Sequence, residues 1–251
     1  MSRPGTGSPG QHEFESGALE DSVVAIGMTS IAMVVAALTV ALVGRAGRAV
    51  AMTAGLVVAL LMVAEYALAS SGVLREWTRR PPPLLVAAAV PILLALVSAL
   101  SRVGWRIAAS TSFAAIIGIQ VFRFPLELVM HQAAISGLMP VEMSYSGRNF
   151  DILTGILAIP VALVALRSRP SRTIIIAWNV VGTLLLVNIL TIAVVSTPIF
   201  AAFGPDHLNT WVADAPYIFL PTVLVPAAVF GHALTWRKLS MEAGLARAAQ
   251  S

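Results

Sequence analysis

Apolar residues along the chain gather into seven long runs, and short stretches that hold most of the basic residues separate these runs. A helix that crosses about 30 Å of hydrocarbon needs roughly 17 to 25 residues, which is the length of most of the runs. The alternation of apolar and polar residues typical of a barrel strand is missing, and a helix satisfies its own backbone groups in lipid. We therefore predict an all-α polytopic membrane protein with seven transmembrane helices. The predicted spans are 23–43, 49–69, 84–100, 107–135 with a kink at Pro125, 150–166, 173–196 and 215–236.

The two ends of the chain differ from the transmembrane domain that we predict for residues 23–236. Residues 1–22 are rich in Gly, Ser, Pro and acidic residues, a composition typical of a mobile tail. Because acidic residues precede the first apolar run, that run is predicted to be a transmembrane helix and not a signal peptide. Residues 237–251 are predicted to form a cytoplasmic tail.

The composition agrees with a membrane protein. Charged residues make up 11% of the chain, whereas they make up about 25% of an average soluble domain. A soluble enzyme and a disordered protein are therefore excluded. The formal net charge of +4 comes from basic residues in short loops, where they orient membrane helices, so no nucleic-acid partner is expected. Their excess after the odd-numbered spans predicts an N-terminus outside and a C-terminus in the cytoplasm.

The residue content also disfavours several cofactors. The chain has no cysteine, so neither a c-type haem attachment nor an iron–sulfur cluster is expected. The only lysine, Lys238, lies beyond the last predicted span. A retinal Schiff base is therefore not expected either, and the identity of any other cofactor stays open.

Polar residues that are able to carry chemistry concentrate in the predicted outer half. Arg123, Glu127 and His131 follow one another at intervals of four residues, which places them on one face of the fourth span. Ionisable residues within a span usually face the protein interior or a water-filled cavity. Two interpretations stay open: a structural network, and a cluster that binds a ligand or handles protons. Glu127 and His131 supply only two ligands of a metal ion, and an HExxH motif is missing, so no metal site is predicted.

Further candidate residues come from the neighbouring segments. Glu65 lies near the outer end of the second span, and Asn188 lies in the outer half of the sixth. Arg148 and Asp151 belong to the segment GRNFD that begins the fifth span, where Asp151 suits the positive end of a helix. Arg148 is expected either to pair with an acidic residue or to bind an anion. The complete predicted ligand-binding set is Glu65, Arg123, Glu127, His131, Arg148, Asp151 and Asn188.

Two polar residues of the last spans are interpreted as structural. Asn179 in the sixth span is expected to bond neighbouring helices to one another. His232 lies near the predicted cytoplasmic end of the seventh span, where we expect an interfacial histidine. Neither residue is included in the predicted ligand-binding set.

Four segments of the C-terminal half carry a resemblance. They are FRFPLELVMH at 122–131, GRNFDILTG at 147–155, AWN at 177–179, and LPTVLVPAAVFGH at 220–232. Together, over about residues 122–238, they resemble an uncharacterised group of bacterial multi-pass integral membrane proteins. The resemblance implies a bacterial cytoplasmic membrane and no particular activity.

Three functions are compatible with these patterns. The leading hypothesis is binding or transport of a small ligand or ion through the polar cluster in the outer half. The first alternative is a membrane-embedded hydrolase, with or without a metal, for which Ser144, Tyr145 and His131 are available although no spacing links them. The second alternative is a structural or assembly subunit with a membrane-protein partner. In every case the lipid bilayer is the surrounding partner, and whether the protein is an enzyme stays open.

Overall fold

The computed structural model describes residues 9–167 and 170–249, which are helical and contain no strand. This confirms the predicted all-helical class. The helices are α1 (Pro9–Val43), α2 (Arg48–Ser70), α3 (Pro83–Leu100), α4 (Arg102–Ser110), α5 (Phe113–Ile119), α6 (Arg123–Ile135), α7 (Ile152–Ala165), α8 (Arg172–Val195) and α9 (Val225–Ala248). Short turns between them are η1 (Gly44–Ala46), η2 (Val73–Arg75), η3 (Gln120–Phe122), η4 (Val141–Met143), η5 (Trp211–Ala213) and η6 (Leu220–Leu224).

Five helical segments of the described chain are long and apolar enough to cross a membrane. They are Asp21–Ala46, Arg48–Ser70, Pro83–Leu100, Phe113–Ile135 and Arg172–Val195. These segments coincide with predicted spans and indicate a membrane protein. The other two predicted spans, 150–166 and 215–236, take different forms: the first is the 14-residue α7, and the second begins with the π-helical turn η6.

The boundaries at both ends of the chain differ from the prediction. Of the predicted mobile tail 1–22, residues 1–8 lie outside the described residues, whereas residues 9–22 form the first turns of α1. The predicted cytoplasmic tail likewise continues α9 as far as Ala248. Both segments contain Glu, Ala and Leu, which favour helix. Each also adjoins a long helix, so it extends an existing helix and needs no new nucleation step.

The predicted fourth span is divided in the structure. Residues 102–110 form the separate helix α4, and the membrane-length segment begins only at Phe113. The division occurs because Ser112 caps a new helix, its hydroxyl accepting a hydrogen bond from the backbone N–H of Ala115 at 3.2 Å. Pro125 has no backbone N–H, so it cannot donate the hydrogen bond that a helix residue normally makes. The turn η3 ends at Phe122, three residues before Pro125, at which the kink was predicted.

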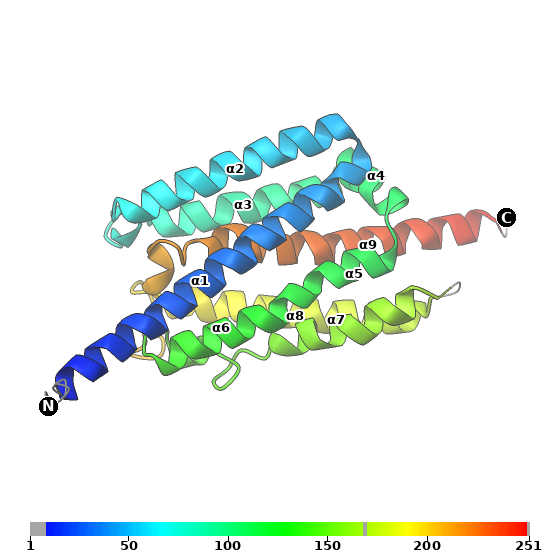
Figure 1. Ribbon diagram of the computed structural model, residues 1–251. Helices are drawn as coiled ribbons and strands as arrows, with labels where there is room; N and C mark the ends of the chain where they lie inside the picture. The colour runs from blue at the N-terminus through cyan, green and yellow to red at the C-terminus, as the bar shows by residue number, and fades with distance from the viewer. Residues whose placement is uncertain (1–8, 168–169, 250–251) are drawn as a thin grey trace, which may run out of the picture.

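The helices run side by side along one common direction, with α9 in contact with α3, α4, α5 and α8 (Figure 1). In contrast, α2 lies at the edge and packs mainly on α1 and η1. Only 6% of the most apolar stretch of α2 is buried, compared with 50% for the segment Phe113–Ile135. The core of the protein is therefore formed mainly by α1 and α5–α9, and α2 contributes little to it.

The segment between α6 and α7, residues 136–151, returns alongside α6 before the short helix α7 begins (Figure 1). We call it the return segment. Ser144 and Asn149 of this segment are fully buried although it is irregular. Its backbone is satisfied from within the protein: the N–H of Asn149 donates to the carbonyl of Ser144 at 3.2 Å, and the side chain of Asn188 donates to the carbonyl of Arg148 at 2.9 Å. Such internal pairing is what allows irregular backbone inside a membrane protein.

Candidate functional site

A buried ion pair lies where α6 meets the start of α7. Arg123, which is 1% exposed, donates from Nε to Oδ2 of Asp151 at 2.6 Å, and its Nη2 pairs with the same oxygen. Asp151 directly precedes α7, where the positive end of the helix favours a carboxylate. The hydroxyl of Thr154 donates to the other oxygen of Asp151 at 3.1 Å. Both charges are therefore compensated by the protein itself.

The same guanidinium continues the network towards α9 and α8. Nη1 of Arg123 lies 2.7 Å from Nε2 of His232. A guanidinium can only donate, so Nε2 accepts and the proton of the neutral ring resides on Nδ1. That Nδ1 donates to Oδ1 of Asn179 at 2.8 Å. His232 is thus not the interfacial histidine that the sequence predicted, because the packing of α9 buries it against Arg123.

Glu127 lies one helical turn after Arg123 and is 2% exposed. Its two carboxylate oxygens accept from Nδ2 of Asn149 at 2.8 and 2.9 Å. Oδ1 of Asn149 in turn accepts from the backbone N–H of Asp151 at 3.0 Å. Asn149 therefore connects the two carboxylates, and we call Arg123, Glu127, Asn149, Asp151, Thr154, Asn179 and His232 the polar network.

Glycines allow the helices to close around this network. A Cβ added to Gly155 in α7 would overlap the backbone nitrogen of Phe124 in α6. A Cβ added to Gly182 in α8 would lie 2.5 Å from Cε1 of His232. Small residues of this kind let membrane helices approach closely, so the network is sealed by backbone contact.

His131 and Arg148 lie apart from the polar network. Nδ1 of His131 is 3.1 Å from the hydroxyl of Ser144 and 3.3 Å from that of Ser146, and its ring stacks on Tyr145 at 4.3 Å. Arg148 lies over the ring of Phe203, 5.0 Å from its centroid, and forms no ion pair with an acidic side chain among the residues that the structure describes. The expected ion pair of Arg148 with an acidic residue is wrong. Asp151 pairs with Arg123 instead, and Glu142 contacts His207 at 3.0 Å.

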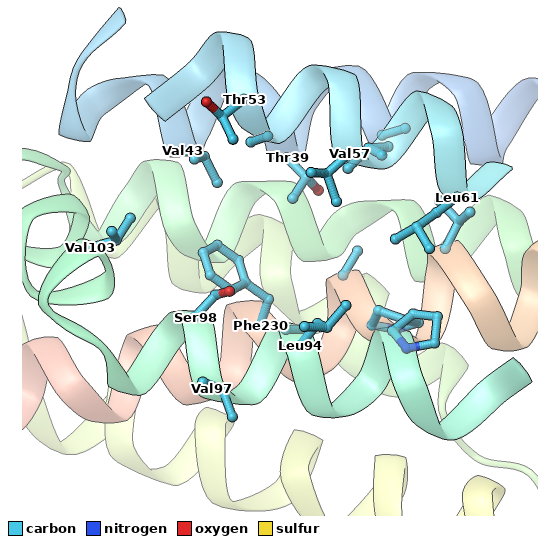
Figure 2. A pocket seen from close by; sticks show the side chains of 18 of the residues that line it. Thr39, Val43, Thr53, Val57, Leu61, Leu94, Val97, Ser98, Val103 and Phe230 are labelled. Atoms are coloured by element: carbon cyan, nitrogen blue, oxygen red, sulfur yellow. The ribbon is translucent and has the colours of Figure 1, made fainter. Parts of the chain in front are cut away.

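Glu65 forms a second site away from the polar network. It is 6% exposed, and its Oε2 has no hydrogen-bond partner within the described residues. It lines a cavity of about 600 Å³ between α2 on one side and α3 and α9 on the other (Figure 2). The cavity walls visible in Figure 2 include Thr39, Val43, Thr53, Val57, Leu61, Leu94, Val97, Ser98, Val103 and Phe230. We call this space the α2 cavity.

The α2 cavity is long and open towards the side. Its wall on α2 extends from Ala49 to Glu65, or about 24 Å at about 1.5 Å per residue. Three wall residues, Val57, Leu94 and Val97, are nevertheless 43%, 49% and 63% exposed. The cavity therefore opens between α2 and α3, on a surface that is otherwise apolar.

Residues 81–240, more than half of the chain, match a family described as Domain of unknown function (DUF8737). The chain belongs to the DUF8737 family. No curated protein and no solved structure matches the chain. The DUF8737 region contains the whole polar network and the α3 and α9 walls of the α2 cavity, whereas α1, α2 and Glu65 precede it.

A smaller cavity of about 80 Å³ adjoins the polar network in the DUF8737 region. It is lined by Arg123, Glu127 and Asp151, and by Leu220 and Leu224 of η6. Thr222 and Val223 of the same turn line the α2 cavity. The π-helical turn is therefore a wall shared by both cavities, and such turns occur frequently at functional sites.

Some residues of the predicted ligand-binding set lie together in the structure, and others lie in different places. Arg123, Glu127 and Asp151 share one network, whereas Glu65, His131 and Arg148 lie elsewhere. Among the described residues no group of three or more His, Cys, Asp or Glu side chains is arranged to hold a metal ion. Sequence reasoning missed His232 and Asn179 as partners of the network, although polar residues within apolar runs are a general signal for a buried site.

Proposed function

We propose that this protein is a seven-span integral membrane protein that binds a small ligand from the lipid bilayer in the α2 cavity. A volume of about 600 Å³ lies within the range of about 300 to 1,000 Å³ of small-molecule sites. The observation that carries the proposal is the combination of this apolar space, its lateral opening, and one buried carboxyl group at its end.

The proposed membrane arrangement extends the five membrane-length helices. The two spans added to them are the fifth, which is α7 together with the buried segment before it, and the seventh, which is η6 with the first part of α9. The distribution of basic residues supports an N-terminus outside and a C-terminus in the cytoplasm. The resemblance of segments 122–238 supports the bacterial cytoplasmic membrane as the location.

The polar network is a weaker ligand site than the α2 cavity. Its charged members already hold protein partners, so a ligand would have to displace Asn149 from Glu127 or Arg123 from Asp151. Breaking a buried pair is costly. The proposed binding function therefore moves from the cluster on α6 to Glu65, which is the member of the predicted set with an oxygen left unpartnered within the described chain.

Labelling with a photoactivatable long-chain alcohol, which carries a diazirine on its alkyl chain, tests this proposal. Ala54 lines the α2 cavity, and Ala59 on the same helix is exposed and is not one of its lining residues. We expect labelled peptides from α2, α3 and α9 in the wild type, loss of this labelling in Ala54→Phe, and its retention in Ala59→Phe. Equal labelling of all three proteins would mean that the probe reports only annular lipid, and the proposal would be wrong.

A membrane-embedded hydrolase is a second candidate, favoured by one contact. The hydroxyl of Ser146 is exposed and lies 3.3 Å from Nδ1 of His131, within reach of a base that can accept its proton. Covalent modification of Ser146 by an alkyl fluorophosphonate, lost in His131→Ala, would support this candidate. Modification of neither Ser146 nor Ser144 would leave the pair as a structural contact that holds the return segment on α6.

A further inference from the structure

Glu65 is the only charged residue among those that line the α2 cavity in the described chain. The rest of the wall is aliphatic or aromatic, apart from a few hydroxyl groups. Two of those hydroxyls are already used within their own helical segments: Thr222 donates to the carbonyl of Ile218 at 2.8 Å, and Ser101 donates to that of Ser98 at 2.8 Å. Within the described chain, the charge of the cavity wall is therefore concentrated at one point, Glu65.

Residues 9–167 and 170–249 provide no compensating donor for this carboxyl group. Oε2 of Glu65 is buried and has no partner within the described residues. Two arginines of the nearby α2–α3 connection are paired elsewhere, Arg75 with Asp214 at 2.7 Å and Arg79 with Glu76 at 2.5 Å. A buried carboxylate normally receives a cation or several hydrogen bonds. A bound molecule that carries an N–H donor and a positive charge would supply what the protein does not.

The position of Glu65 fits one orientation of such a molecule. Glu65 lies five residues before the end of α2 at Ser70, or about 8 Å from it at about 1.5 Å per residue. In the proposed arrangement this is close to the membrane boundary, where charged headgroups reside. The remainder of the α2 cavity extends from Glu65 towards the other boundary between aliphatic side chains. A molecule with a charged headgroup next to Glu65 and a single apolar chain along the aliphatic part of the cavity would fit this arrangement.

We infer that the ligand of the α2 cavity is a cationic amphiphile, an alkyl or isoprenoid chain whose ammonium group retains an N–H that donates to Glu65. This inference rests on the proposed function and specifies its ligand class. Anionic amphiphiles such as fatty acids are disfavoured because a second negative charge would face Glu65. A quaternary ammonium supplies the charge but no N–H donor, so it binds more weakly than a primary amine.

Four probes with the same twelve-carbon chain separate these contributions: dodecylamine, dodecanol, dodecanoate and dodecyltrimethylammonium. Their affinities are measured by native mass spectrometry on the full chain in nanodiscs. Dodecylamine is expected to bind most tightly to the wild type. A hydrogen bond to a charged group is worth about 1.5–3 kcal/mol, so Glu65→Gln should weaken dodecylamine by at least about tenfold. Binding of dodecanol should stay unchanged.

Two further variants keep the test decisive. Glu76→Gln removes a partly exposed carboxylate that does not line the α2 cavity, and it should leave all four affinities unchanged, which controls for general attraction of cations. Glu65→Asp keeps the charge but withdraws it by one methylene, and it should give an affinity for dodecylamine between the wild type and Glu65→Gln. Thermal unfolding of each variant verifies that it is folded.

The outcomes distinguish the two proposals. If dodecanol and dodecylamine bind equally and Glu65→Gln affects neither, the α2 cavity is a binding site but the cationic ligand class is wrong. Binding of dodecanoate as tight as that of dodecylamine overturns the ligand class in the same way. If none of the four probes binds and the photoactivatable alcohol does not label the cavity, the proposed function itself is wrong.

Discussion

The polar network and the α2 cavity both contain a buried carboxyl group, and they differ in what surrounds it. Glu127 receives Asn149, and Asp151 receives Arg123 and Thr154. Glu65 has one oxygen for which the described chain provides no donor. The carboxylates of the first site are compensated by protein partners, whereas the second keeps an oxygen without one among the described residues.

The difference between the sites follows from how the helices pack. Around the polar network, Gly155 and Gly182 bring α6, α7, α8 and α9 close together. At the α2 cavity, α2 keeps most of its surface free and lies mainly on α1. A buried charge in a membrane protein therefore points to structure where packing is tight, and to ligand binding where a space remains beside it.

The largest expected effect tests whether the two carboxyl groups play different roles. Asp151→Asn leaves Arg123 buried without its counter-charge, and breaking such a pair should lower the free energy of unfolding by about 3–5 kcal/mol. Glu65→Gln replaces a buried carboxyl group that has no hydrogen-bond partner within the described chain, so the free energy of unfolding should stay the same or increase. Unfolding of both variants in mixed detergent micelles measures the difference. Equal losses in both would show that Glu65 has a structural partner and would remove the contrast.

A smaller effect tests the close packing at the polar network. Gly155→Ala places a methyl group against the backbone of Phe124, and overpacking of this kind should lower the free energy of unfolding by about 1–3 kcal/mol. Gly118 in α5 has open space around an added Cβ, so Gly118→Ala should stabilise the helix by about 0.5–1 kcal/mol. The same micelle titration compares the two. A neutral Gly155→Ala would indicate that α6 and α7 are able to move apart, and that the network is less sealed than the distances imply.

The smallest effect on stability concerns the α2 cavity. Ala54→Phe places a ring into an existing space that is open to the side, so it should change the free energy of unfolding by less than about 1 kcal/mol. The same variant is expected to abolish labelling by the photoactivatable alcohol. Loss of binding without loss of stability would separate the α2 cavity from the folding core. A destabilisation as large as that of Gly155→Ala would instead mean that α2 is packed more tightly than its exposure suggests.

Part of the polar network could be predicted from local spacing. Arg123 and Glu127 recur at helical intervals within an apolar run, and both are buried in the structure as this pattern predicted. His131 continues the same spacing, yet it is only partly buried and contacts Ser144 and Ser146 of the segment before α7 instead. Spacing identified the shared face, but it carried no information on where along that face the protein interior ends.

The sequence by itself determined the all-helical class and the helices long and apolar enough to cross a membrane, because hydropathy and helix formation depend on neighbouring residues. Only the tertiary structure decided that Arg123 binds Asp151 and His232, which are 28 and 109 residues away. Partners at such distances depend on the packing of α6, α7 and α9. The α2 cavity has no local pattern either, because the aliphatic residues that line it are the same types that face lipid. Its existence depends on the distance between α2 and the rest of the bundle.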